Sequence, residues 1–369
     1  MSTYDRFEFV TESPYLAIPS ALIVGIASLI GTVGNLILIV VLATNKSLHN
    51  IDTIFVVNLV ISDSYVVCIA GPLSIVAKIE GEQFFDRNPG LCQTIASLCT
   101  ISCVTSLMTI SAMSMNRYVF ICAHEYYERI FKKWQSIAIC ACFYLVGGTL
   151  VMLNFAGVGD HGFDRKSVEC IWDRMATYPY TVVFSIVLVW IPSLVTGICY
   201  LKIYLFVRSH RRRVKAHQGS TAQNSPFMKN IRLAKTLFVI YAVFITCWAP
   251  YALLIVLDSQ DTYPHSVHVY ITAFAHLHPS LNWFIYYITN RKFKNAYNNL
   301  FYKIKVYFHC AVDDDMMASE HTPTQPTVTS TAIQADASVD SVNEDSGSNM
   351  TDFTPKKQNL EQESQEINC

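Results

Sequence analysis

Long apolar stretches alternate with short polar ones along most of the chain. Seven of them have the length that a helix needs to cross a bilayer, about 20 residues. They cover residues 18–43, 52–78, 92–121, 134–156, 179–207, 233–257 and 265–288. The second and third contain Ser, Thr and single charged residues, which indicates helices that face one another as well as lipid. The pattern predicts an all-α integral membrane protein built as a seven-transmembrane helix bundle.

The pattern changes after the seventh stretch. Residues 289–306 mix bases with Phe293, Tyr297, Leu300, Phe301 and Ile304 at helical spacing, which predicts an amphipathic eighth helix on the inner leaflet. Residues 307–369 are rich in Asp, Glu, Ser, Thr and Pro and predict a disordered cytosolic tail. Residues 1–17 form a short polar N-terminal tail, so the membrane-associated part of the chain is predicted over residues 18–306.

Composition agrees with a membrane protein, and the placement of charge orients it. Apolar residues make up 52% of the chain and charged residues only 15%, against about 25% in soluble proteins. Bases without acids fill residues 208–232, and more bases follow the third and seventh stretches. The positive-inside rule places these loops in the cytosol and the N-terminus outside. The same clusters are suited to contact anionic membrane lipids.

The chain has twelve cysteines, most of which lie inside apolar stretches, where small apolar packing is their ordinary role. Cys92 and Cys170 differ, because both fall on the predicted outer side. A disulfide between them is chemically allowed there, although spacing alone does not decide it. Cys310 follows the predicted amphipathic helix and is either a palmitoylation site or a free juxtamembrane cysteine.

Polar side chains within the apolar stretches mark the functional positions, because such groups are costly inside a membrane. In combination they resemble class A (rhodopsin-like) G-protein-coupled receptors. The motifs are Asn35 in the first stretch, Asn58 and Asp63 in the second, and Cys92 with Asn116, Arg117 and Tyr118 ("NRY") in the third. Pro192 and Tyr200 follow in the fifth, Phe244, Cys247, Trp248 and Pro250 ("FITCWAP") in the sixth, and Asn282 and Tyr286 in the seventh.

The resemblance implies a receptor, not an enzyme, that binds a ligand near its outer half and swings helix 6 outward to activate a heterotrimeric G protein. Arg117 would be the switch arginine, approached by Tyr200 and Tyr286 in the active state. Trp248 and Phe244 would couple the pocket to helix 6, with Leu107 and Pro192 packed beside Phe244 and a kink at Pro250.

Asp63, Ser106 and Asn282, together with Asn35, resemble the sodium pocket of this family. His278 stands where the family most often has a polar amide. Two interpretations therefore remain: sodium bound at Asp63, or a neutral Asp63 hydrogen-bonded to its neighbours. No other cofactor or metal is expected.

The sequence departs from the family's pattern around the switch arginine and in the seventh helix. Asn116 replaces the usual acid beside Arg117, and Asn230 replaces a second acid at the start of helix 6. We therefore expect no ionic restraint on Arg117, so that the off state is held by hydrogen bonds and packing, or held loosely with notable basal activity. Trp283 replaces a proline, while Pro279 lies one turn earlier.

The predicted pocket is mostly apolar, which favours a small, largely uncharged or lipid-like ligand. "NRY…IC" resembles the melatonin-receptor group, although Leu188 stands where that group has a histidine. Weaker features resemble opsins, with His276 in place of the retinal lysine, and adenosine receptors, with Ile255 in place of their amide. The pocket residues are Cys99, Thr100, Cys103, Trp172, Phe184, Leu188, Trp248, Tyr251, Ile255, Thr272 and His276.

Two alternatives to a signalling receptor make different demands on the sequence. A transporter would need related halves and paired interior charges, and the sequence has neither. A non-signalling seven-helix protein, such as a scavenger or a heteromer partner, stays open because of Asn116 and Trp283. In the tail, Thr322, Thr324 and Thr327 lie close together near acids, which predicts phosphorylation and binding of arrestin. No nucleic-acid partner is expected.

Overall fold

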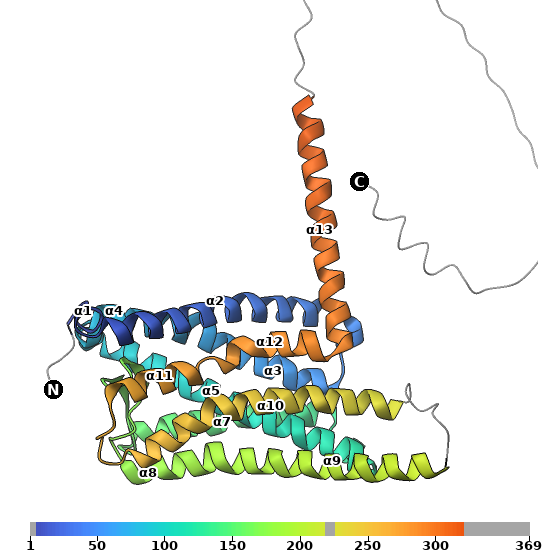
Figure 1. The fold of residues 1–369 in the computed structure, drawn as a ribbon, viewed down its shortest axis with the longest axis horizontal. Coiled ribbons are helices and arrows are strands. Elements are labelled where there is room, and N and C mark those ends of the chain that lie inside the picture. Colours follow the sequence, from blue (N-terminus) through green and yellow to red (C-terminus); the bar gives the residue numbers. More distant parts are fainter. Residues whose placement is uncertain (1–4, 218–225, 321–369) are drawn as a thin grey trace, which may run out of the picture. The chain divides into compact units, whose positions relative to one another are not determined.

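The structure, a computed structural model, describes residues 5–217 and 226–320. Only the backbone is described for residues 187–188, 211, 213–217, 226–230 and 308–320. The described residues between 5 and 300 form one compact unit, in which long helices lie side by side as a bundle (Figure 1). Among the described residues, six helices are long and apolar enough to cross a membrane.

The helices cover the predicted stretches. Several extend past the predicted ends, and the second and fifth are interrupted within their length. The first is α2 (Pro14–Thr44), the third α5 (Pro89–Cys122), the fourth α7 (Lys133–Phe155) and the sixth α10 (Pro226–Leu257). The second is α3 (Ile51–Tyr65), a π-helical turn (Val66–Ala70) and α4 (Gly71–Asp86). The fifth is α8 (Tyr178–Phe184), a π-helical turn (Ser185–Trp190) and α9 (Ile191–His217). Short elements are α1 (Glu8–Glu12), 3-10 turns at Lys46–Leu48 and His124–Tyr126, and α6 (Tyr127–Ile130).

The seventh helix is broken just before Pro279, the proline that lies one turn before Trp283. It consists of α11 (His265–Ala275) and α12 (His278–Thr289), with Pro279 in the first turn of α12. Proline is tolerated there because its missing N–H would have no partner within the helix. Trp283 continues α12 and packs on Gly34 of α2, where any Cβ would overlap the indole ring.

The outer end of the bundle is covered by a hairpin and by the N-terminal segment. Strand β1 (His161–Asp164) pairs antiparallel with β2 (Glu169–Trp172). The predicted disulfide is present: Cys170 of β2 is bonded to Cys92 of α5, with their Cα atoms 5.2 Å apart. Residues 5–13, predicted as part of a polar tail, pack instead on this end, because Phe9 is buried against Val168 and Val269.

The apolar core fills the inner half of the bundle. It joins Phe55 of α3, Leu107 and Ile110 of α5, Phe244 of α10 and Tyr286 of α12. Hydrogen bonds cross it as well: Asn58 Nδ2 donates to Thr109 Oγ1 over 2.7 Å, and Asn35 Nδ2 donates to the carbonyl of Pro279 over 3.2 Å. The second bond ties α2 to the break in the seventh helix.

Helix α13 (Arg291–Glu320) begins where the amphipathic helix was predicted but does not end at residue 306. Residues 307–320, predicted as part of a disordered tail, continue it. These residues include Ala, Met and Val, which are compatible with a helix. The prediction of disorder followed the acid-rich composition of the whole tail instead. The side chain of Cys310 and the threonines Thr322, Thr324 and Thr327 lie outside what the structure describes.

Candidate functional site: an outer cavity, a polar centre and an inner cavity

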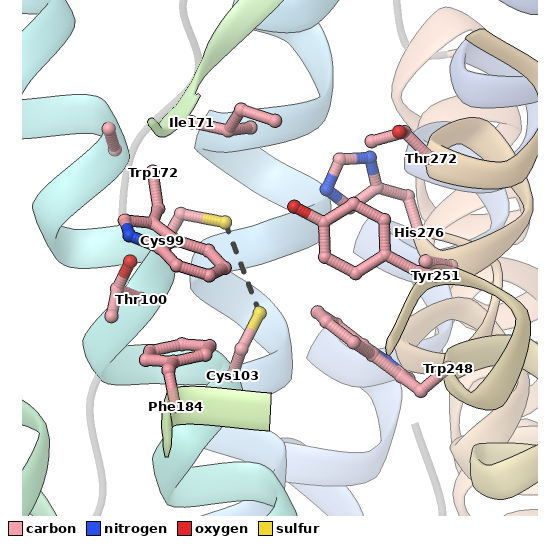
Figure 2. Close-up of a pocket in the computed structure, with 12 residues that line it drawn as sticks. Cys99, Thr100, Cys103, Ile171, Trp172, Phe184, Trp248, Tyr251, Thr272 and His276 are labelled. Carbon is pink, nitrogen blue, oxygen red and sulfur yellow. Dashed lines mark hydrogen bonds between the residues drawn. The ribbon is translucent and has the colours of Figure 1, made fainter. Parts of the chain in front are cut away.

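The outer cavity lies between α5, α10, α11 and the hairpin and has a volume of about 60 Å³. Figure 2 shows its side chains converging from these elements. Nine of the predicted pocket residues line it, joined by three that the sequence did not single out. The lining is Ala96, Cys99, Thr100, Cys103, Ile171, Trp172, Phe184, Trp248, Tyr251, Thr272, Ala275 and His276.

Two predicted pocket residues are not part of this lining. Ile255 is only 2% exposed and lies in the packed interior, not at the cavity. Its helix α10 presents Trp248 and Tyr251 instead. The side chain of Leu188 is outside the described ones, so its position as a pocket residue stays a prediction.

The hairpin closes the cavity from outside. Trp172 of β2 stacks on Phe184, with ring centroids 4.2 Å apart and an interplanar angle of 28°. Ile171 and Trp172 are both buried. Pockets for drug-sized ligands have roughly 300–1,000 Å³, so the described conformation is closed to an organic ligand of that size.

His161 of β1 is a site residue that sequence reasoning missed. Its Nε2 lies 3.0 Å from the hydroxyl of the predicted pocket residue Thr100, and its Nδ1 pairs with the side-chain amide of Asn154. An amide N–H can only donate, so Nδ1 accepts and Nε2 carries the proton. Burial, opposed by Asp160, lowers the pKa of His161 to about 4. A neutral histidine therefore pins the hairpin to α5.

A buried charge pair adjoins the cavity at its outer edge. Lys78 of α4 and Glu169 of β2 are 2% and 3% exposed, with Nζ and Oε2 3.9 Å apart. The hydroxyl of Ser74 donates to Glu169 over 2.6 Å, and His276 Nδ1 lies 3.8 Å from the same carboxylate. Burial alone would raise the pKa of Glu169, but Lys78, His276 and Ser74 lower it below its usual value.

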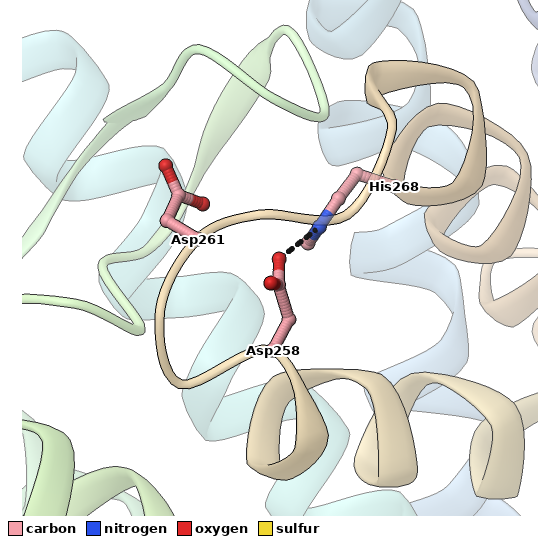
Figure 3. Close-up of side chains that lie close together, drawn as sticks. All are labelled: Asp258, Asp261 and His268. Atoms are coloured by element: carbon pink, nitrogen blue, oxygen red, sulfur yellow. Dashed lines mark hydrogen bonds and ion pairs between the residues drawn. The ribbon is translucent and has the colours of Figure 1, made fainter.

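A second charged cluster is centred on Asp258 and Asp261 of the loop between α10 and α11 and on His268 of α11 (Figure 3). His268 Nε2 lies 2.8 Å from Asp258 Oδ2, and the three side chains of Asp258, Asp261 and His268 are close enough to hold a metal ion. However, Arg174 and Lys166 lie 3.6 and 3.7 Å from the same Asp258 oxygen. Because these cations already neutralise the acids, the cluster acts as an ionic clasp between two outer loops.

The polar centre lies below the outer cavity, around Asp63. Ser106 Oγ donates to one carboxylate oxygen over 2.9 Å, and Asn282 Nδ2 donates to the other over 2.6 Å. Trp248 Nε1 donates to His278 Nδ1 over 2.8 Å, while His278 Nε2 lies 3.7 Å from Asp63. The tryptophan of the outer cavity is thereby linked to the buried carboxylate.

The predicted activation residues surround this centre. Phe244 stacks on Trp248 with centroids 5.9 Å apart and meets His278 edge-on at 4.9 Å. Leu107 belongs to the same buried cluster as Phe244. Pro192 is buried in α9, and Pro250 lies inside α10.

The expectation that Arg117 lacks an ionic partner is wrong. Its guanidinium pairs with the carboxylate of Asp52, in the first turn of α3. Asn116 Oδ1 accepts from Arg117 Nε over 3.1 Å and from Nη2 over 2.5 Å. Sequence reasoning missed Asp52 because it searched only the two positions where the family carries an acid. Packing of α3 on α5 brings a third position to the arginine.

A large cavity of about 1140 Å³ opens at this inner end. Arg117 and Tyr286 line it, together with the bases Arg232 and Lys235 of α10. Tyr200 does not line it and packs on α10 instead, with its ring centroid 5.3 Å from that of Phe238. Tyr118 lies beneath Lys202, whose Nζ is 5.4 Å from the ring centroid.

Comparison with known proteins decides the family. The family model for the 7 transmembrane receptor (rhodopsin family) matches residues 34–286. This chain is a member of that family. Human melatonin receptor type 1B is 26% identical over 307 residues, covering 81% of this chain and 83% of that receptor. Melatonin receptor type 1A from Mus musculus is 27% identical over 296 residues, covering 78% and 81%.

The fold is also that of a solved member of the family. The crystal structure of squid rhodopsin superposes with a TM-score of 0.67 at 21% identity, covering 82% of this chain and 88% of that one. The protein is therefore a G-protein-coupled receptor and a multi-pass membrane protein with a seven-transmembrane bundle. Like the members of its family, it is a receptor and not an enzyme.

Proposed function

We propose that this receptor binds a small, largely uncharged ligand in the outer cavity and activates a heterotrimeric G protein at the inner one. Outward movement of α10 would connect the two events. The N-terminus would lie outside the cell and the C-terminus in the cytosol, in agreement with the basic residues on the inner loops.

One observation carries this proposal. Trp248 lines the outer cavity and donates a hydrogen bond to His278, beside Asp63. A ligand that displaces the indole breaks this bond and moves the stacked Phe244, which lies deeper in α10. Pro250 gives α10 a bend at this level, because it removes one backbone donor.

The proposed ligand class rests on the residues that line the outer cavity and on the melatonin receptors to which the chain is similar. The cavity wall is mostly aromatic and aliphatic, and the relatives reported above are melatonin receptors. We propose melatonin and other uncharged indoles as the first ligands to test. Binding would require Ile171 and Trp172 to move outward, since the cavity holds only about 60 Å³.

The polar centre is proposed to work without sodium. Both carboxylate oxygens of Asp63 already accept hydrogen bonds, from Ser106 and Asn282. The tail threonines Thr322, Thr324 and Thr327 are proposed to bind arrestin once phosphorylated, because three phosphates supply dense negative charge.

A G-protein dissociation panel in cells expressing the full chain tests the function, first without ligand and then with melatonin and related indoles. We expect dissociation of at least one G-protein class, and its loss in Arg117→Ala at equal surface expression. Failure of every G-protein class across a broad ligand library would favour a non-signalling receptor instead.

A further inference from the structure

Four bases line the inner cavity and form what we call its basic wall. Arg232 and Lys235 belong to α10, and Arg291 and Lys292 to the first turn of α13. All four residues are exposed. None of them takes part in an ion pair within the part of the chain that the structure describes. The cavity of about 1140 Å³ is larger than the roughly 300–1,000 Å³ of pockets for drug-sized ligands, so it can admit a solute of that size.

The lining of the cavity carries an excess of positive charge. Asp52 is the one acid among the lining residues, and it pairs with the buried Arg117. The basic wall therefore has no carboxylate left to it among the lining residues. Like charges around one cavity repel one another, and an anion bound between them replaces this repulsion with attraction. The inner cavity thus favours a ligand with several negative charges.

Two helices begin at the same cavity and add to its positive potential. The lining includes residues 50–53 at the start of α3 and residues 290–293 at the start of α13. The N–H groups of a first helical turn have no partner inside the helix, and the helix dipole places partial positive charge there. Phosphate groups commonly bind at such ends. The two helix ends therefore reinforce the attraction that the basic wall exerts on an anion.

We propose that the basic wall binds a compound with two or more phosphate monoesters, of the kind carried by inositol phosphates. One phosphate monoester has about 1.5–2 negative charges at neutral pH, so two of them match the four bases. Arg232 and Arg291 suit phosphate in particular, because a planar guanidinium donates two parallel hydrogen bonds to its oxygens. The site goes beyond the proposed function, since this binding would occur whether or not the receptor couples to a G protein.

The same phosphate groups can come from two sources. A phosphoinositide would present them from the membrane, and a free inositol phosphate would bring them from solution. Both would meet the same four bases, so binding has to be measured with each source. A general attraction of bases to an anionic membrane differs from this site, because it depends on the total charge of the lipids and not on phosphate monoesters.

Binding of radiolabelled inositol trisphosphate to the purified full-length receptor in detergent tests the proposal with a soluble probe. We expect saturable binding of one molecule per receptor. Arg232→Gln/Lys235→Gln should weaken this binding by about thirtyfold, since each base contributes roughly a factor of five. Arg291→Gln/Lys292→Gln should weaken it by a similar factor. Equal thermal unfolding temperatures would show that the variants are folded.

A matched control removes two bases elsewhere on the inner side. Arg129 and Lys133 are exposed and do not belong to the cavity lining. Arg129→Gln/Lys133→Gln should bind the soluble probe as the wild type does. An equal loss in this control would assign the binding to general charge attraction and overturn the site.

The membrane source is tested in nanodiscs of phosphatidylcholine that contain a phosphatidylinositol bisphosphate or, at equal total charge, phosphatidylserine. Native mass spectrometry then counts the lipids that the receptor retains. We expect the wild type to retain the bisphosphate lipid in preference to phosphatidylserine. Binding of the lipid alone would identify the membrane as the source, and binding of inositol trisphosphate would show that the headgroup is sufficient.

Three results would overturn the proposal. They are binding of neither phosphate probe, equal retention of the two anionic lipids, and binding of polyglutamate as tight as that of inositol trisphosphate, which would indicate a site for an acidic peptide. None of these measurements depends on signalling, so a failed G-protein panel leaves the outcome readable.

Discussion

At the scale of single residues, Arg117 is the side chain whose surroundings differ most from expectation. It is 2% exposed and pairs with Asp52, with Asn116 accepting two further hydrogen bonds. A buried guanidinium without a carboxylate would be strongly unfavourable. Asp52 thus supplies, from a different helix, the carboxylate that Asn116 does not offer.

The replacement Asp52→Asn should raise basal G-protein signalling several-fold, because it removes the charge partner of Arg117. Basal dissociation of the G protein at equal surface expression is the measurement. Glu128→Gln, an exposed acid in the neighbouring inner loop, is the control.

A second replacement sharpens this test. Adding Asn116→Asp to Asp52→Asn should return basal signalling towards wild type, because a carboxylate is again next to Arg117. If Asp52→Asn leaves the basal signal unchanged, the ion pair does not restrain the receptor.

At the scale of elements, the hairpin and the broken seventh helix determine which side chains reach the outer cavity and the polar centre. Contacts that fix the hairpin include the disulfide to Cys92, the bonds of His161 to Thr100 and Asn154, and the Glu169–Lys78 pair. The break after α11 places His276 in the outer cavity and His278 in the polar centre. An unbroken helix would not present both side chains inward so close together in sequence.

Acidification should loosen the hairpin through His161. Its pKa of about 4 lies below the ordinary value of 6.5, so the folded state favours the neutral ring. This contribution to stability is complete above pH 6.5 and is lost as pH falls towards 4. By pH 5 the folding free energy should have lost on the order of 2 kcal/mol. Thermal unfolding of the purified receptor at pH 7.5 and 5 measures it, and His161→Asn should show a smaller pH dependence. An equal dependence in both proteins would rule out this histidine as the cause.

Gly34→Ala should destabilise the receptor by about 1–3 kcal/mol, because the added methyl group overlaps the ring of Trp283. Thermal unfolding is the measurement, and Trp283→Leu should restore part of the loss. Gly25→Ala is the matched control on the same helix, since its Cβ meets only Ile75 at 3.4 Å. A loss of equal size at both glycines would argue against the proposed clash.

At the scale of the whole bundle, the outer end is closed by covalent and ionic links. The disulfide joins residues 78 positions apart in sequence, and the clasp of Lys166 and Arg174 with Asp258 ties the hairpin loop to the α10–α11 loop. Burial alone would raise the pKa of Asp258, but hydrogen bonds from Tyr263, His268 and Thr262 and the charge of Lys166 lower it. The clasp therefore stays charged at physiological pH.

Cys170→Ser should lower stability by about 2–5 kcal/mol and reduce surface expression, since it opens this long covalent loop. Thermal unfolding and antibody staining of an N-terminal tag are the measurements. Because the two sulfurs form a single bond, the double variant Cys92→Ser/Cys170→Ser should lose no more stability than either single variant. Additive losses would mean that the cysteines act separately.

The sequence alone determined that the chain is a helical membrane protein, because the length of a membrane-spanning helix and the cost of a polar group inside it are local constraints. For that reason the sequence was sufficient to identify the functional positions Asn35, Asp63, Arg117, Trp248 and Asn282. Tertiary structure decided the partners: Asp52 for Arg117, His161 for Thr100, and Glu169 for Lys78. Each pair joins separate elements, and the distance between such groups depends on how the helices pack, which no local pattern encodes.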